Sequence, residues 1–436
     1  MKSLKEKILD LSSPSYSRFL EVIQEYAQGL LSQCLISKGE DPEGKISNRI
    51  FLSRLVANAR LLEDFLDDHG AQRNEKWFYF RELVATARGF GQTGYLILFI
   101  KKRYPTDSLE LQDFKEFFQG MVQVQDFLVK AILYIFKKLL IQANKLGIRV
   151  PETPFDMPGE DDSLGNARLP VTMHKTRYGD EEKDIAKVCS LYQNLAQNFD
   201  PVACHTDYKN FQKLKQIVPD VINEECIRKF ELEMHNLESV YDTYVKYKSR
   251  EDKDPRLAHL RNYISIPLLL LEAARAWAHF YERHPKIHEE IHHEVNLGCI
   301  LDYILNWALF YCRKFVAYGK NLADELLHDY TSKGSIELGI PRNLGFHLRP
   351  ATLVAKIVNH YGSEVFMIVG EDKFDAGSIL SITWAGGKIA RDNIQTVTFT
   401  GDKRALKDLE ILAGVNYGED TMGKDIPLPK ELSYLR

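Results

Sequence analysis

A histidine, an arginine and a proline stand close together in the C-terminal part of the chain, at a spacing that suits anion chemistry. Residues 345–352 read Gly-Phe-His-Leu-Arg-Pro-Ala-Thr, so His347 lies two residues before Arg349 and three before Pro350. Neutral imidazole is a nucleophile near neutral pH, because its ordinary pKa is about 6.5. A guanidinium group holds phosphate through paired hydrogen bonds. The set therefore predicts transfer of a phosphoryl group through His347, with Arg349 stabilising the phosphate.

The residues that follow form an element able to position this site. Apolar side chains recur at helical spacing from Ala351 onward. Proline is well tolerated in the first turn of a helix, where its missing N–H would have no partner. We therefore expect His347 near the N-cap of a helix over residues 350–360. Free backbone N–H groups and the positive end of the helix dipole favour a bound anion there.

The segments around this helix alternate between strand and helix patterns. Alternating side chains predict strands over residues 335–340, 364–369 and 394–400. Amphipathic spacing predicts a helix over residues 403–414 and a shorter one over 378–384. The predicted order is β-α-β-β-α-β-α, an α+β open-faced sandwich of helices on one antiparallel sheet.

These motifs resemble a known family. Residues 345–351 are similar to the active-site signature of the HPr phosphocarrier proteins of the bacterial sugar phosphotransferase system. Residues 375–386 resemble the second signature of that family, a short helix with a regulatory serine at Ser378. The resemblance covers residues 334–420 and implies a phosphocarrier domain without a metal or cofactor. No comparable resemblance extends to residues 1–330.

The resemblance also implies roles and partners. His347 would accept a phosphoryl group at Nδ1 from an enzyme I-like donor, and an enzyme IIA-like protein would receive it. In some members a serine kinase phosphorylates the position of Ser378. Exposed residues of the two signature helices would dock these partners: Phe346, Ile379, Leu380, Thr383 and Trp384. Trp384 is larger than the residue usual at its position, which could change the choice of partner.

The rest of the chain is expected to be mostly helical. With 436 residues, the chain is long enough for two to four domains. Helical spacing extends through residues 1–150 and again through 184–330, and the two blocks could pack together. Between them, residues 151–183 are rich in proline and acidic side chains, which is typical of a linker or long surface loop. Residues 421–436 are expected to form a tail.

Composition limits the compartment and the partners. The formal net charge of −4 argues against a nucleic-acid surface. The longest apolar run, residues 264–280, is interrupted by Pro267, Glu272 and Arg275, so we expect no membrane insertion. The first residues lack an apolar signal core, and six cysteines without a CxxC pair suit a reducing cytoplasm.

Two further segments match known sequence motifs but lack the neighbouring elements or ligands that those motifs require. Residues 89–94 fit GxGxxG but follow a helical segment, so we interpret them as a turn between helices. Residues 288–292 fit HExxH, yet no third zinc ligand is identifiable, and a solvated helix face is the better interpretation.

Two functions stay open at this point. In the first, the protein is a phosphocarrier or a regulatory phosphotransferase component, and its helices select the partner. In the second, it is a signalling or scaffold protein, and the HPr-like domain serves as a phosphorylation-state reporter or binding module. In the first, the domain is a phosphoryl carrier with a phosphohistidine intermediate rather than a self-contained catalyst.

Overall fold

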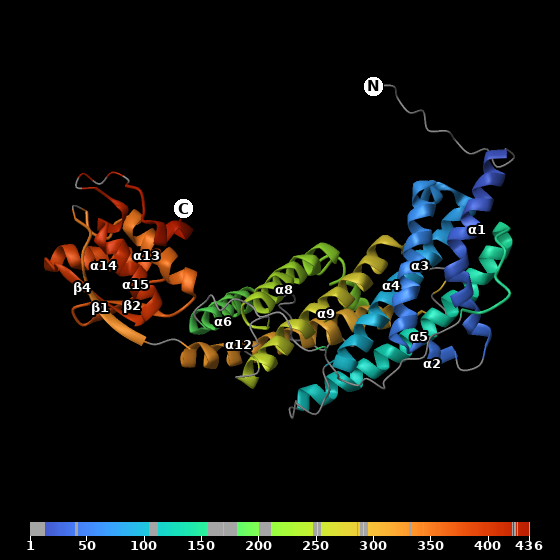
Figure 1. Cartoon of the computed structure of the whole chain (residues 1–436), viewed down its shortest axis with the longest axis horizontal. Helices are drawn as coiled ribbons and strands as arrows, with labels where there is room; N and C mark the ends of the chain where they lie inside the picture. The colour runs from blue at the N-terminus through green and yellow to red at the C-terminus, as the bar shows by residue number, and fades with distance from the viewer. Residues whose placement is uncertain are drawn as a thin grey trace, which may run out of the picture. The chain divides into compact units, whose positions relative to one another are not determined.

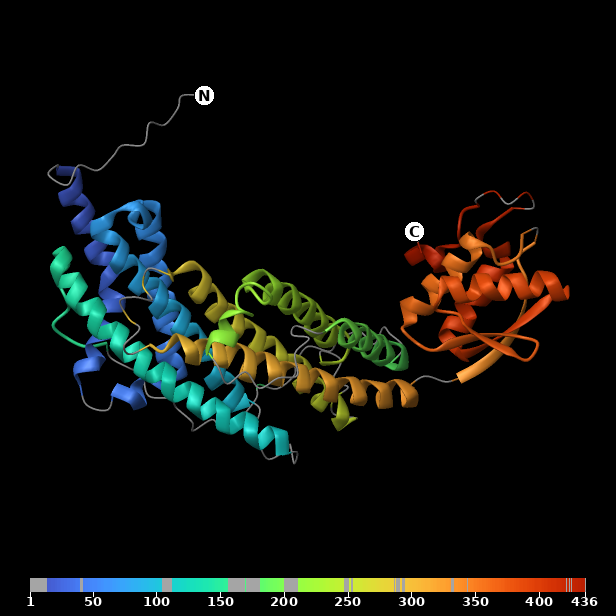
Figure 2. The same ribbon diagram turned by 180° about the vertical axis from the view of Figure 1, so that it is seen from behind.

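The computed structural model divides into two units, which are described separately. It describes residues 14–39, 42–103, 112–155, 169, 181–199, 211–246, 251, 254–285, 287, 291, 295–330, 333–342, 344–420, 422, 424 and 426–435. The first unit comprises Met1–Thr172, Asp200–Met234 and Ser265–Phe315. The second comprises Met173–Phe199, His235–Ile264 and Val316–Arg436. Figure 1 and Figure 2 show long helices over most of the chain and a sheet near its C-terminal end.

The first unit is built from helices, as the apolar spacing predicts. Its long helices are α1 (Pro14–Cys34), α3 (Arg49–Asp68), α4 (Glu75–Arg103) and α5 (Gln112–Leu146). Shorter helical segments are η1 (Leu35–Lys38), α2 (Pro42–Ile46), η2 (Ala71–Arg73), α7 (Phe211–Lys215), α11 (Leu297–Asp302) and η5 (Tyr303–Leu309). Parts of α8 (Glu224–Tyr244), α9 (Pro255–Arg283) and α12 (Phe310–Tyr330) complete it.

Helices from both halves of residues 1–330 pack together in this unit. The ring of Phe117 on α5 stacks on Trp307 with centroids 5.5 Å apart. The indole Nε1–H of Trp307 donates to the carbonyl of Phe117 at 3.2 Å. The first unit therefore draws its core from both predicted helical blocks.

The GxGxxG motif lies inside α4, so the expected turn between helices is wrong. A Cβ at Gly91 would lie 2.9 Å from Leu55 Cδ2, and one at Gly94 would lie 3.2 Å from Leu52 Cδ1. Leu52 and Leu55 belong to α3. The missing side chains therefore allow α3 and α4 to approach closely, which outweighs the low helix propensity of glycine.

One helix in the described part of the chain is long and apolar enough to cross a membrane. Residues Glu75–Lys101 of α4 meet that criterion, but 72% of the apolar window is buried inside the protein. The helix also carries Arg81 and Glu82, whose side chains form an ion pair at 3.0 Å. Burial and internal ion pairs are the properties of a core helix in a folded helical unit.

The second unit contains α6 (Glu181–Asn198) and the C-terminal sheet. Strands β1 (Lys333–Gly339), β2 (Val365–Val369), β3 (Asp372–Asp375) and β4 (Thr396–Asp402) pair in the antiparallel order β1-β4-β2-β3. Helices α13 (Leu348–Tyr361), α14 (Ile379–Asp392) and α15 (Lys403–Gly414) join them, and short η6 (Asn416–Gly418) and η7 (Lys430–Leu435) follow. The predicted combination of one antiparallel sheet with helices is confirmed.

One apolar core holds the sheet and helices together. Val365, Met367 and Val369 of β2 alternate with less buried residues and share this core with Val397 and Phe399 of β4. The side chains of Leu432 and Leu435 are buried in the same core. The segment expected to be a tail therefore packs against the C-terminal domain over residues 426–435.

Some segments interpreted from the sequence lie outside the residues that the structure describes. These include His288, Glu289 and His292 of the HExxH motif and most of the predicted linker, residues 156–168 and 170–180. The residues that the structure describes contain no group of three or more side chains able to bind a metal ion.

Candidate functional site

His347 is the N-cap residue of α13. Its backbone is extended, with φ −77° and ψ −174°, and its carbonyl accepts the first helical hydrogen bond from Ala351 N–H at 3.1 Å. Gly345, with φ +61°, adopts the left-handed conformation that glycine accepts at low cost, and its carbonyl accepts from His347 N–H at 2.8 Å. The predicted N-cap position is confirmed, whereas the role of phosphoacceptor stays a prediction.

Phe346 fixes the loop before the histidine from inside the domain. Its side chain is 1% exposed and packs edge-on against Phe399 and Tyr417, with centroids 6.3 and 5.1 Å away. The prediction that Phe346 belongs to an exposed docking face is therefore wrong. Burial of this ring instead holds the backbone that carries His347, because fully buried aromatic rings fix their own chain position.

A buried carboxylate holds one edge of the His347 ring. The Nε2 atom of His347 lies 3.0 Å from Oε1 and 3.1 Å from Oε2 of Glu419. The imidazole is 33% exposed, whereas the Glu419 side chain is only 2% exposed. Among the described residues, His347 provides the only hydrogen bond to the carboxylate of Glu419. A buried carboxylate requires a donor, so in the neutral imidazole Nε2 carries the proton and Nδ1 keeps its lone pair.

The turn after α15 positions Glu419. Three consecutive residues, Asn416, Tyr417 and Gly418, have φ of 48°, 55° and 82°. Tyr417 is 1% exposed and donates its hydroxyl to the carbonyl of Gly339 on β1 at 2.8 Å. The Asn416 amide donates to the Glu419 carbonyl at 3.0 Å. These contacts hold a strained turn in one conformation and so fix the carboxylate that it carries.

Glu419 was missed from the sequence because it belongs to no local pattern. It lies 72 residues after His347 and follows the last predicted helix. The only available signal was one of two adjacent acidic residues in a Gly-Glu-Asp segment, which is ordinary surface composition.

The first turn of α13 supplies the rest of the site. Arg349 lies in that turn, two residues after His347, and its side chain is half-buried. Among the described residues, the His347 side chain makes no capping hydrogen bond to the helix. The N-terminal end of α13 can therefore present its backbone dipole and an arginine to an anion on Nδ1.

Residues 379–386 of the predicted second signature form the N-terminal half of α14. Ser378 is its N-cap, and the hydroxyl of Ser378 accepts from the backbone N–H of Ser381 at 3.3 Å. The helix runs to Asp392 and is longer than the predicted 378–384. Asn393, with φ 54°, ends it in the left-handed conformation.

All four predicted docking residues on α14 are exposed. The exposed fractions are 39% for Ile379, 68% for Leu380 and 73% for Trp384, and Thr383 is also exposed. The hydroxyl of Thr383 donates a hydrogen bond to the carbonyl of Ile379 at 2.8 Å. Two further apolar side chains near His347 in the sequence, Leu344 and Leu348, are also exposed, at 73% and 69%. They are not among the predicted docking residues.

Comparison with known proteins agrees with the geometry at the C-terminal end. No curated protein and no solved structure matches the chain. The sequence model of the family described as "PTS HPr component phosphorylation site" matches residues 335–413, and residues before this range match no family. This range contains His347, Arg349 and Ser378, and the C-terminal part of the chain is an HPr-type domain of the phosphotransferase system.

Proposed function

We propose that the protein is a cytoplasmic phosphotransferase-system component that accepts a phosphoryl group on Nδ1 of His347. An enzyme I-like protein would be the donor, and an enzyme IIA-like protein would receive the group. The observation that carries this proposal is the N-cap histidine whose Nε2 atom lies 3.0 Å from the buried carboxylate of Glu419. That contact leaves Nδ1 as the ring nitrogen with a lone pair.

The transfer step follows from these residues. Nδ1 attacks phosphorus, a nitrogen–phosphorus bond forms, and the bond from phosphorus to the donor atom breaks, with its electron pair going to the donor. Positive charge develops on the imidazole ring, and the Nε2–H hydrogen bond to Glu419 stabilises it. The α13 N-terminus and Arg349 stabilise the phosphoryl oxygens. Because His347 is 33% exposed, an acceptor can reach phosphorus in line for the reverse displacement.

The exposed residues of α14 fit the role of a partner surface. Leu380 and Trp384 are one helical turn apart on α14, and both expose large apolar side chains. Aromatic anchors of this kind dominate binding energy at interfaces.

Trp384→Ala should raise the KM for the protein donor about tenfold or more, with Leu61→Ala on α3 as an exposed control. An unchanged KM for the donor would remove Trp384 from the partner surface.

Ser378 is the proposed target of a serine kinase. A phosphate on this N-cap residue would lie at the start of α14 and would add negative charge beside Ile379 and Leu380. Ser378→Asp retains a capping side chain, so it should keep domain stability while slowing transfer from the donor. Equal transfer rates for the wild type and Ser378→Asp would argue against regulation at this serine.

Labelling tests the central proposal. The full chain is incubated with phosphoenolpyruvate and a purified enzyme I, and protein-bound phosphate that is acid-labile and base-stable is measured. We expect labelling of the wild type and of His328→Ala, an exposed histidine on α12. His347→Ala should abolish it. Absent labelling, or labelling that survives His347→Ala, would leave only the signalling or scaffold function.

A further inference from the structure

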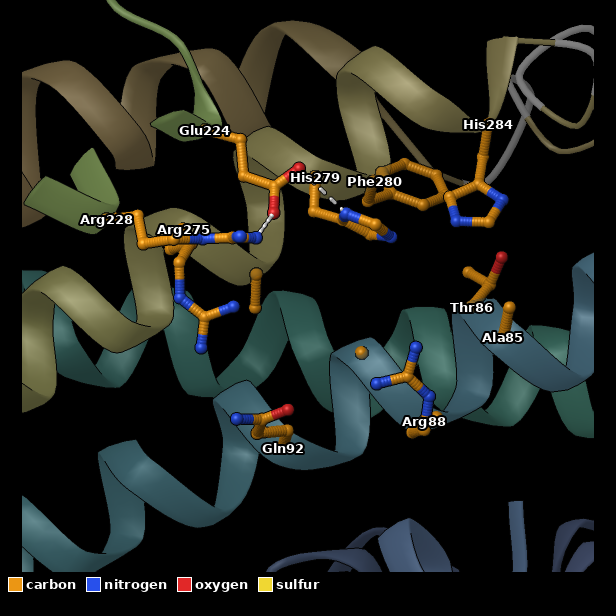
Figure 3. A pocket seen from close by; sticks show the side chains of 12 residues that line it. Ala85, Thr86, Arg88, Gln92, Glu224, Arg228, Arg275, His279, Phe280 and His284 are labelled. Atoms are coloured by element: carbon orange, nitrogen blue, oxygen red, sulfur yellow. Dashed lines mark hydrogen bonds and ion pairs between the residues drawn. The ribbon is translucent and has the colours of Figure 1, made fainter. Parts of the chain in front are cut away.

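The first unit contains a polar cavity that the phosphocarrier site does not use. It has a volume of about 150 Å³ and lies between α4 and α9, beside the first turn of α8 (Figure 3). Its charged and titratable lining residues are Arg88, Glu224, Arg228, Arg275, His279 and His284. Among the described lining residues, three arginines therefore face a single carboxylate.

Two of these arginines are held from outside the cavity. Arg88 Nε donates to Oε2 of Glu63 at 2.5 Å, and its Nη2 approaches Oε1 of the same residue at 3.3 Å. Arg275 Nε donates to Oε2 of Glu231 at 2.5 Å. Neither Glu63 nor Glu231 lines the cavity. The two carboxylates thus fix the guanidinium groups without covering their other edges.

The remaining guanidinium nitrogens have no partner in the described part of the chain. These are Nη1 of Arg88 and both terminal nitrogens of Arg275. Figure 3 shows Arg88 and Gln92 on α4 across from Arg275 and His279 on α9. The side chains of Arg88 and Arg275 are only 28% and 26% exposed. Each guanidinium group is thus fixed on one edge by a carboxylate and open on the other, an arrangement suited to an anionic ligand.

The one carboxylate on the wall is neutralised by its own neighbours. Glu224 pairs with Arg228, and its Oε2 lies 2.9 Å from Nδ1 of His279 and 3.7 Å from Nε of Arg283. His284 in turn pairs with Glu82 at 2.7 Å. The charge of Glu224 is therefore compensated locally, and the edges left for a ligand belong to Arg88 and Arg275.

We propose that this cavity binds a small anion that carries a phosphate group. Two guanidinium groups from different helices converge on it, and a tetrahedral dianion can accept hydrogen bonds from both at once. The amide of Gln92 adds a neutral polar group to the same wall. The proposal gives the helical part of the chain a ligand and does not depend on phosphate transfer through His347.

Calorimetry with inorganic phosphate tests the proposal. Because the α13 N-terminus can itself hold phosphate, the full-length chain carries His347→Ala and Arg349→Gln in every titration. We expect saturable binding at one site and at least a tenfold loss of affinity in Arg275→Gln. Arg275→Lys, which keeps the charge but loses the planar fork, should also bind more weakly. Arg60→Gln is the control, because Arg60 is 75% exposed on α3 and away from the cavity lining.

The comparison ligand is succinate, which carries carboxylates in place of phosphate. Weaker binding of succinate than of phosphate supports the proposal, and equal or tighter binding overturns it. Absence of saturable phosphate binding, or equal affinities for wild-type and Arg275 variants in this background, also overturns it. Circular dichroism and the melting temperature of each variant report folding. Should Arg275→Gln fail to fold, the same readings are taken from Arg275→Lys.

Discussion

At the scale of single residues, the 3.0 Å contact between Nε2 of His347 and Glu419 governs which ring nitrogen can react. A histidine nitrogen is a nucleophile only where it carries no proton, and the partner of the other nitrogen decides which one that is. In the proposed transfer, His347 would supply the reacting atom and Arg349 would stabilise the phosphate. Glu419, in a turn distant in the sequence, would determine which ring nitrogen of His347 carries the proton. The proposed phosphoryl transfer therefore depends on all three residues.

The first prediction concerns Glu419→Gln. We expect phosphorylation of His347 to slow about 10- to 100-fold, because a hydrogen bond to a charged group contributes about 1.5–3 kcal/mol. Nitrogen-15 NMR of the imidazole should show the Nε2–H tautomer in the wild type and a tautomer mixture in the variant. The spectrum separates positioning from simple loss of stability, since an unfolding variant would lose the dispersed signals altogether. An unchanged tautomer together with an unchanged rate would exclude Glu419 from the site.

At the scale of elements, the approach of α14 to the loop before α13 sets the place of His347. Gly386 lies where a Cβ would be 2.8 Å from the carbonyl oxygen of Phe346, which is closer than side chains tolerate. At the neighbouring Gly387, a Cβ would meet no atom within 4 Å. The two glycines are adjacent in α14, but only one of them is required by packing.

The second prediction uses this pair as matched variants. Gly386→Ala should lower the free energy of unfolding by about 1–3 kcal/mol through overpacking against Phe346. It should also slow phosphorylation, because the displaced carbonyl lies next to His347. Gly387→Ala should raise the free energy of unfolding by about 0.5–1 kcal/mol, since alanine favours an open helix position. Urea unfolding of the C-terminal domain measures both, and equal effects of the two substitutions would contradict the packing argument.

The same glycines explain where sequence-based prediction stopped. Amphipathic spacing predicts a helix only over residues 378–384, whereas α14 continues through Gly386 and Gly387 to Asp392 despite the low helix propensity of glycine. Strand β3 has no predicted range, because its burial pattern shows no alternation. By contrast, the amphipathic spacing of α13 and α15 can be recognised from the local sequence. Both helices therefore lie close to their predicted ranges. Contacts between distant segments, such as that of Glu419, leave no such pattern.

At the scale of the whole molecule, both units combine an apolar core with buried, paired carboxylates. The first unit buries an ion network in which Arg81 contacts Glu63, Asp67 and Glu82, and Glu82 also contacts His284. The C-terminal domain of the second unit has a continuous apolar core of sheet and helices and buries the carboxylates of Asp402 and Glu419. Acid should therefore destabilise the first unit as the carboxylates of its ion network become protonated.

The third prediction is acid sensitivity through Glu82. Burial raises the pKa of this carboxyl, but the hydrogen bonds and charges of His284 and Arg81 outweigh burial, and its pKa falls below the ordinary 4.5. A lowered folded-state pKa gives stability that is present above pH 4.5 and lost as the pH falls through the folded-state pKa. Glu82→Gln should cost about 3–5 kcal/mol at pH 7 and progressively less at lower pH.

Thermal melts of the first unit between about pH 3 and 7 measure this dependence. The control is Glu21→Gln, because the Glu21 side chain is 65% exposed and pairs only with exposed Arg18 among the described residues. A constant difference between wild type and Glu82→Gln across that pH range would contradict the linkage.

The last prediction concerns the end of the C-terminal domain, which the family match places at 413. Among the described residues, the buried members of the apolar core lie between Leu338 and Leu435, so a fragment of residues 331–436 should fold without the helices before it. A fragment ending at 420 would lose Leu432 and Leu435 from the core and the hydrogen bond of Tyr434 to Asp408 at 2.6 Å. Removal of a buried leucine side chain costs about 2–5 kcal/mol, so two of them approach the whole net stability of a small domain.

Urea unfolding of the two fragments measures the difference under conditions where a single domain unfolds in one step. Leu432→Ala and Ser433→Ala in the longer fragment form a matched pair, because Leu432 is fully buried and Ser433 is exposed. We expect the first to lower the midpoint and the second to leave it unchanged. If the fragment ending at 420 unfolds at the same urea concentration as the longer one, residues 426–435 only cover a domain that is already complete. A lower midpoint instead makes them part of the fold that holds Glu419 against His347.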